Sequence, residues 1–151
     1  MGPAYEPTSG IERFGAGTPP VIAIAAVEVG ARLVAEAGID RLAAKGRAMT
    51  QLMVALGDAW LAPHGIALAS PRNPARRGSH VTFAHPQAWQ MTQALIDRSV
   101  VPDFREPARV RLGPAPLYTR FVDVWDAMDR FRALLEDKVH EQYPAERARV
   151  T

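Results

Sequence analysis

The sequence contains no cysteine among its 151 residues. A disulfide framework, a thiolate nucleophile and a cysteine-ligated metal site are therefore excluded. Long apolar runs are also missing, because the stretch over residues 21–34 contains Glu28 and Arg32 and is shorter than the roughly 20 residues that a bilayer requires. It does not follow a basic leader with a cleavage site. We therefore expect a cytoplasmic protein that does not interact with a membrane.

The sequence also has only a small surplus of positive charge. Eighteen Lys and Arg residues face 16 Asp and Glu residues, which gives a formal net charge of +2, too little to indicate binding to nucleic acid. Arg72, Arg76 and Arg77 form a local basic cluster, but no aromatic side chains for stacking on bases lie between them. We interpret this cluster as a solvated loop, and we expect no nucleic-acid partner.

Residues for catalysis and metal binding are scarce. Lys45 and Lys138 are the two lysines, and the histidines at positions 64, 80, 85 and 140 lack the spacing of metal ligands. No Ser-His-Asp signature and no phosphate-binding glycine loop is present. The sequence therefore predicts no metal site and contains no signature of these catalytic classes.

What the sequence does contain predicts a folded domain. A chain of this length buries roughly 70% of the surface that its unfolded state exposes, and its 48% of hydrophobic residues is an ordinary globular value. Apolar residues at helical spacing indicate helices near residues 19–36, 39–60, 86–96 and 121–135, and alternation indicates strands at 66–69, 80–85 and in the region 103–112. The order predicts an α/β (α+β) two-layer sandwich with a small, mainly antiparallel sheet and helices packed on it.

The first of these helices has two notable features. Thr18 precedes Pro19 and Pro20, a pattern typical of an N-cap followed by proline in the first turn. A hydroxyl there either caps the helix or contacts an anion. The helix is apolar on nearly every side, from Val21 to Val34, so we expect that its own chain does not cover it completely.

Arg111 lies in the stretch RVRLGPAPLYTRF, residues 109–121. Val110 and Leu112 share one face of a strand, which places Arg111 on the other face. The run 113–116 is a stiff corner that fixes the direction of a guanidinium, a two-pronged donor suited to a carboxylate. We expect Arg111 to point off the sheet without a strong internal partner. The alternative is an arginine paired with Asp103 or Asp123.

Several segments together resemble a known family. RVRLGPAPLYTRFVDVWDAM, with FGAGTPP, GIDRLAAKGRAMT, GSHVTFAHP and VVPDFREP, is similar to the C-terminal portion of bacterial kynureninases, over essentially the whole chain. These pyridoxal-phosphate enzymes have the aspartate aminotransferase fold and hydrolyse L-kynurenine to anthranilate and L-alanine. The resemblance implies a cytoplasmic homodimer with pyridoxal 5'-phosphate as cofactor, acting in tryptophan catabolism and NAD biosynthesis.

The resemblance also implies roles for individual residues. Arg111 matches the arginine that binds the substrate's α-carboxylate, and Thr18 matches a residue that contacts the cofactor phosphate across the dimer interface. Asp103 and Arg105 match family positions, for which the residues themselves suggest a turn-stabilising ion pair. Neither Lys45 nor Lys138 matches the Schiff-base lysine, so we expect a C-terminal fragment that is inactive and does not hold the cofactor alone.

The implied organisation has four parts. Residues 1–17 are an extended lead-in belonging to a missing large domain, 18–36 a connecting helix, 37–143 the small C-terminal domain and 144–151 a polar tail. Two alternatives stay open: the small domain of another class V-like pyridoxal-phosphate enzyme, and a free-standing module that binds small acids or mediates association.

Overall fold

The computed structural model describes residues 6–15 and 17–146, and its contacts divide the chain into two units, Met1–Gly38 and Ile39–Thr151. Of the lead-in predicted over residues 1–17, residues 1–5 and 16 lie outside the described residues. Gly10–Phe14 form a short 3-10 helix, η1, so the lead-in is not extended throughout. Of the predicted tail, residues 147–151 also lie outside the described residues.

Helix α1 of the first unit spans Val21–Ala37. Its N-cap is Pro20, with no side-chain capping bond, so the prediction that Thr18 caps this helix is wrong. A residue before proline avoids the helical region, which delays the helix until after the second proline. No residue of α1 is buried, and Ile22 is 88% exposed. Gly38, at φ 82°, ends the helix.

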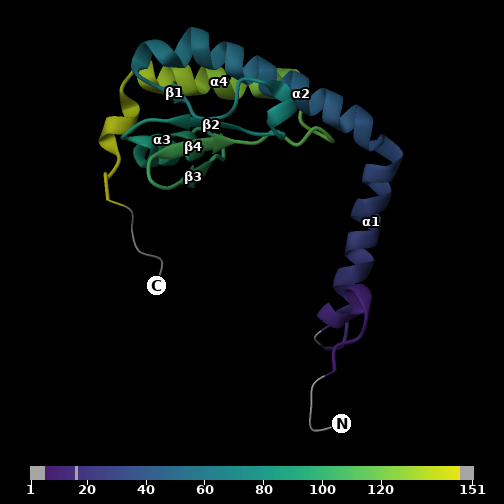
Figure 1. Cartoon of the computed structure of the whole chain (residues 1–151). Helices are drawn as coiled ribbons and strands as arrows, with labels where there is room; N and C mark the ends of the chain where they lie inside the picture. Colours follow the sequence, from purple (N-terminus) through teal and green to yellow (C-terminus); the bar gives the residue numbers. More distant parts are fainter. Residues whose placement is uncertain (1–5, 16, 147–151) are drawn as a thin grey trace. The chain divides into compact units, whose positions relative to one another are not determined.

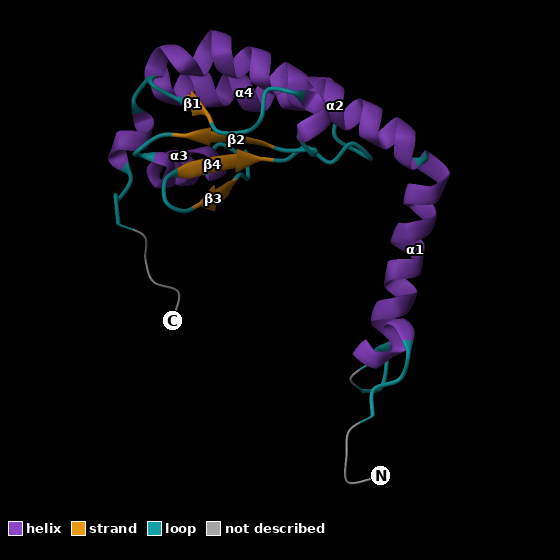
Figure 2. Ribbon diagram, viewed as in Figure 1, coloured by secondary structure: helices purple, strands orange, loops and turns teal. Residues whose placement is uncertain are grey.

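The second unit alternates helices with short strands (Figures 1 and 2). In chain order its elements are α2 (Ile39–Leu56), η2 (Gly57–Leu61), η3 (Ala62–His64), β1 (Ala67–Leu68), η4 (Pro74–Arg76), β2 (Val81–Ala84), α3 (Ala88–Ile96), β3 (Asp103–Arg105), β4 (Arg109–Leu112), α4 (Phe121–Glu136) and η5 (Val139–Gln142). Here η2 is a π-helical turn that continues α2, and the other η elements are 3-10 helices. Gly65, in the left-handed conformation, ends this helical run.

The four strands form one antiparallel sheet in the order β1-β2-β4-β3. Helices α2 and α4 contact each other and run side by side along the sheet (Figure 2), and α3 packs against β3 and β4. The predicted two-layer α+β fold with a small antiparallel sheet is confirmed.

The core lies between this sheet and the three helices. Val81 and Phe83 of β2 and Val110 and Leu112 of β4 are buried, as alternation requires. They meet apolar stripes from the helices, with Met49 and Met53 on α2, Met91 and Leu95 on α3, and Met128 and Phe131 on α4. One sheet face is thus buried, which leaves the other face for the remaining strand residues.

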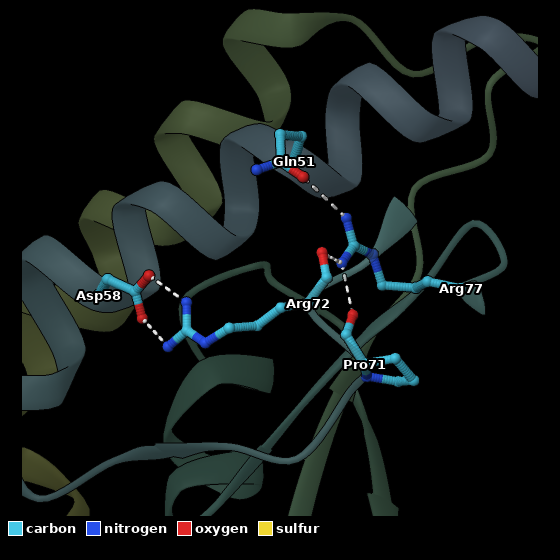
Figure 3. Close-up of polar contacts among 5 residues, drawn as sticks. All are labelled: Gln51, Asp58, Pro71, Arg72 and Arg77. Carbon is cyan, nitrogen blue, oxygen red and sulfur yellow. Dashed lines mark hydrogen bonds and ion pairs between the residues drawn. The ribbon is translucent and has the colours of Figure 1, made fainter. Parts of the chain in front are cut away.

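The loop over residues 70–79 is held by arginine side chains (Figure 3). Arg72 makes a two-point ion pair with Asp58, at 2.7 and 2.8 Å. Arg77 is only 9% exposed; it donates to the carbonyl oxygens of Pro71 at 2.6 Å and Arg72 at 3.1 Å, and to Gln51 Oε1 at 3.3 Å. One planar guanidinium has several N–H donors and can therefore join these acceptors from two segments of the chain. The interpretation of this arginine cluster as a solvated loop is therefore wrong for Arg77.

Candidate functional site: the open face of the sheet

The second face of the sheet presents polar side chains from three neighbouring strands. In β4, Arg109 and Arg111 alternate with the buried Val110 and Leu112. Arg111 is directly opposite Thr82 of β2 and opposite Asp103 of β3, and residues directly opposite in a ladder project to the same side. The strand position and outward direction predicted for Arg111 are therefore confirmed.

A second set of directly opposite residues on this face adds more positive charge. Arg109 is flanked by Ala84 of β2 and Arg105 of β3. This face thus carries three arginines (Arg105, Arg109 and Arg111), and two of them, Arg105 and Arg111, contact the carboxylate of Asp103. From the sequence we predicted a binding role for Arg111 but not for Arg109, although the alternation in RVRL places both arginines on one face of the strand.

Arg111 is not without a partner, contrary to the prediction. Its Nη2 donates to Oδ2 of Asp103, which confirms one of the two alternatives. The other alternative fails because Asp123 pairs with Arg120 at 2.6 Å. Direct register across β3 and β4 explains the contact, since it brings the two side chains together.

The Arg111–Asp103 contact is a half-exposed one. The side chains are 35% and 43% exposed, and Asp103 Oδ2 also accepts from Arg105 Nη2 at 2.7 Å, as expected for the Asp103–Arg105 ion pair. Desolvation acts to raise the pKa of the Asp103 carboxyl, but the hydrogen bonds and charges of Arg111 and Arg105 outweigh it and hold that pKa below 3.8. Asp103 is therefore an anion at neutral pH.

A stiff corner follows Arg111 in the chain. The Ala115 N–H donates to Thr119 Oγ1 at 3.1 Å, and the hydroxyl of Ser79 donates to the carbonyl of Pro114 at 2.8 Å. Pro116 packs on α2 at Gly46, where an added Cβ would lie 3.1 Å from the Pro116 ring. These contacts fix the backbone that leaves the strand at Gly113. Ser79 and Gly46 were not predicted from the sequence.

A groove of about 540 Å³ lies beside this corner. Its floor is apolar, with Met53, Val100 and Met128, and Asp126 and Arg130 contribute charge. Arg111 does not line this groove. The groove and the open sheet face are therefore separate features of the second unit.

Thr18, the other predicted site residue, belongs to the first unit. It is exposed and lies two residues before Pro20, the N-cap of α1, whose side chain makes no capping bond. Pro19 and Pro20 have no N–H group, so the N–H donors of the first turn begin at Val21. A hydroxyl and uncapped N–H groups are suitable donors for a phosphate.

The lysines and histidines do not assemble into a site. Lys45 is half-buried on α2, and Lys138 is exposed at the start of η5. Over residues 6–15 and 17–146, no group of three or more His, Asp or Glu residues could hold a metal ion. In the same part of the chain, no helix is both long and apolar enough to cross a membrane.

The architecture is that of a two-layer α+β domain with one open, arginine-bearing sheet face. Residues 42–131 match the profile of the family described as kynureninase C-terminal domain. The chain belongs to this family.

Individual relatives agree with the family match. The chain is 43% identical over 142 residues to the kynureninase of Pseudomonas fluorescens, covering 94% of this chain and 34% of that protein. It is also 43% identical over 136 residues to the kynureninases of Burkholderia mallei (strain ATCC 23344) and Burkholderia pseudomallei (strain K96243), covering 90% of this chain and 33% of each. The chain thus spans about a third of the length of the curated relatives that it matches.

Proposed function

We propose that this chain is the C-terminal part of a kynureninase, a pyridoxal-phosphate-dependent hydrolase that converts L-kynurenine and water to L-alanine and anthranilate. The observation that carries the proposal is the identity of 43% to a kynureninase over 94% of the chain. The open sheet face agrees with it, because a substrate with an α-carboxylate requires a fixed cationic donor.

In this proposal Arg111 binds the α-carboxylate of the substrate. Asp103 uses one Nη of its guanidinium, and the side chain is 35% exposed, so further N–H donors remain accessible to a ligand. A planar fork fixes both the position and the orientation of a carboxylate, which orients the bond to be cleaved.

The described residues fit one contact to the cofactor. Thr18 and the uncapped first turn of α1 suit its phosphate, and we propose that Thr18 makes this contact from the partner subunit of a homodimer. When bound, pyridoxal phosphate supplies the electron sink for cleavage of the carbon-carbon bond. The lysine that carries the cofactor is assigned to the preceding domain, because neither Lys45 nor Lys138 matches it.

The remaining parts of the proposal concern organisation and place. Residues 1–17 belong with the large domain, 18–36 connect, 37–143 form the small domain and 144–151 are a tail. We assign the enzyme to the cytoplasm and to tryptophan catabolism, as the family resemblance implies.

The direct experiment uses the full-length protein that contains this chain. Purified protein is supplied with pyridoxal phosphate and L-kynurenine, and anthranilate and L-alanine are quantified. We expect equimolar products whose formation depends on added cofactor. Failure of the loaded protein to consume L-kynurenine, while it acts on another amino acid, would assign the chain to a different pyridoxal-phosphate enzyme.

A further inference from the structure

Arg111 and Asp103 stand directly opposite each other in the antiparallel pair of β3 and β4. The backbone ladder therefore brings the Asp103 side chain beside Arg111 before any ligand arrives. Within the described part of the chain, the Arg111 side chain pairs with Asp103 through Nη2 and Oδ2. A long arginine side chain has many rotamers, and a fixed acceptor at one edge selects among them.

The same carboxylate oxygen is itself held in place. Arg105 Nη2 lies 2.7 Å from Asp103 Oδ2, so two guanidinium groups approach one oxygen from the same strand pair. This second contact holds Asp103 from the side of its own strand. Because the charge of Asp103 is shared between two arginines, its carboxylate also competes less strongly with a ligand carboxylate for Arg111.

The charge balance of this face leaves room for an anion. Arg105 and Arg111 carry two positive charges, and both contact the single negative charge of the Asp103 carboxylate. A carboxylate ligand is therefore still attracted after the internal pair has formed. Half-exposed pairs of this kind contribute little to folding, which indicates that the arrangement serves orientation more than stability.

We propose that Asp103 is the positioning residue for Arg111: it holds one edge of the guanidinium so that the remaining N–H donors face the carboxylate of the substrate. This inference rests on the proposed function of Arg111. It adds a residue that acts on substrate binding through Arg111 without touching the substrate.

The test uses Asp103→Asn in the full-length enzyme, with two ligands. We expect the KM for L-kynurenine to rise about fivefold, within the range of coupling between contacting residues, with kcat changed less than about twofold. The inhibition constant of the α-carboxamide of kynurenine should not change, because that ligand offers no anion to Arg111. In an Arg111→Met background, Asp103→Asn should have no further effect.

Two further variants make the test decisive. Asp58→Asn removes the carboxylate of another arginine pair of the same unit and should leave KM unchanged. Asp103→Glu retains the charge but moves it by one methylene, and its KM should lie between those of the wild type and Asp103→Asn. If Asp103→Asn does not fold, Asp103→Glu provides the test in its place.

Three results would overturn the inference while leaving the proposed function intact: an active enzyme whose KM is insensitive to both Asp103 variants, an equal loss of affinity for carboxylate and carboxamide, or the same loss in the Arg111→Met background. An unmodified protein that does not turn over kynurenine would overturn the proposed function, and the inference with it.

Discussion

The hydroxyl of Ser79 donates a hydrogen bond to the carbonyl of Pro114, 2.8 Å away, and joins segments that lie 35 residues apart in the chain. This bond connects the loop before β2 to the corner after β4. Both segments meet α2 at Gly46, where an added Cβ would lie 3.1 Å from Pro116 Cγ and 3.1 Å from Ser79 Oγ. The corner beside Arg111 is thus attached to the core through a glycine.

Gly46→Ala should therefore destabilise the protein. Alanine is favoured over glycine inside a helix by about 1 kcal/mol, but here the Cβ meets two packed groups, and overpacking costs about 1 to 3 kcal/mol. We expect a net loss of about 1 kcal/mol in the free energy of unfolding, measured in urea. Gly30→Ala is the control, because its Cβ would meet nothing within 4 Å; equal effects of the two changes would refute the packing argument.

Arg77→Lys should weaken the loop over residues 70–79. The planar guanidinium of Arg77 donates to the carbonyls of Pro71 and Arg72 and to the side-chain amide oxygen of Gln51. The ammonium of a lysine retains the charge but cannot reach all three acceptors at once. A hydrogen bond from a charged donor contributes about 1.5 to 3 kcal/mol, so the loss of these bonds from the buried Arg77 side chain should be visible in thermal unfolding. The exposed Arg76 gives the matched control Arg76→Lys, and an effect of similar size there would contradict the assigned role of Arg77.

Acid should destabilise the domain through His85. Burial lowers the pKa of the His85 imidazole below 6.5, and the nearby His140 adds to the effect. His85 Nδ1 also accepts a hydrogen bond from the Gln87 N–H at 3.1 Å, which protonation at Nδ1 removes. Since the unfolded chain takes up this proton more readily, the stability contribution is complete above pH 6.5 and is lost as the pH falls through the folded-state pKa.

The measurement compares unfolding free energies at pH 7.5 and pH 5.5. His85→Gln should reduce the difference between the two values, whereas His64→Gln, at an exposed position, should not. A pH dependence that is identical in both variants would assign it to other groups.

Thr18→Ala in the full-length enzyme should weaken retention of the cofactor. A hydrogen bond to a charged group contributes about 1.5 to 3 kcal/mol, so the dissociation constant of pyridoxal phosphate should rise at least about tenfold. Thr8→Ala provides a control at another exposed threonine of the first unit. If both variants hold the cofactor as the wild type does, Thr18 has no part in the phosphate site.

The fold could be predicted from the sequence where burial imposes a period. The alternation of Val81 with Phe83 and of Val110 with Leu112 fixed the buried sheet face, and the apolar stripe of residues 121–135 located α4 within about one residue. The start of α1 was misplaced because two consecutive prolines allow two positions for the cap. Local patterns do not decide between them.

The candidate site could be predicted only in part, because its contacts link distant segments. The direction of Arg111 followed from its strand, but its pairing with Asp103 depends on the register between β3 and β4. Arg77 looked like its exposed neighbours because nothing in its local sequence indicates that the loop folds onto Gln51 of α2. The packing of Ser79 and Pro116 on Gly46 of α2 could not be predicted either, because no local pattern links these three distant segments.

The most direct test of the account measures the KM for L-kynurenine in the full-length enzyme carrying Arg111→Lys, with Arg109→Lys as the control on the same strand and face. Lysine retains the charge and loses the two-point geometry, so we expect the KM of Arg111→Lys to rise about tenfold or more, equivalent to about 1.4 kcal/mol of binding, while Arg109→Lys stays near the wild type. A normal KM for Arg111→Lys, or an equal rise in both variants, would contradict the assignment of Arg111 to the substrate carboxylate.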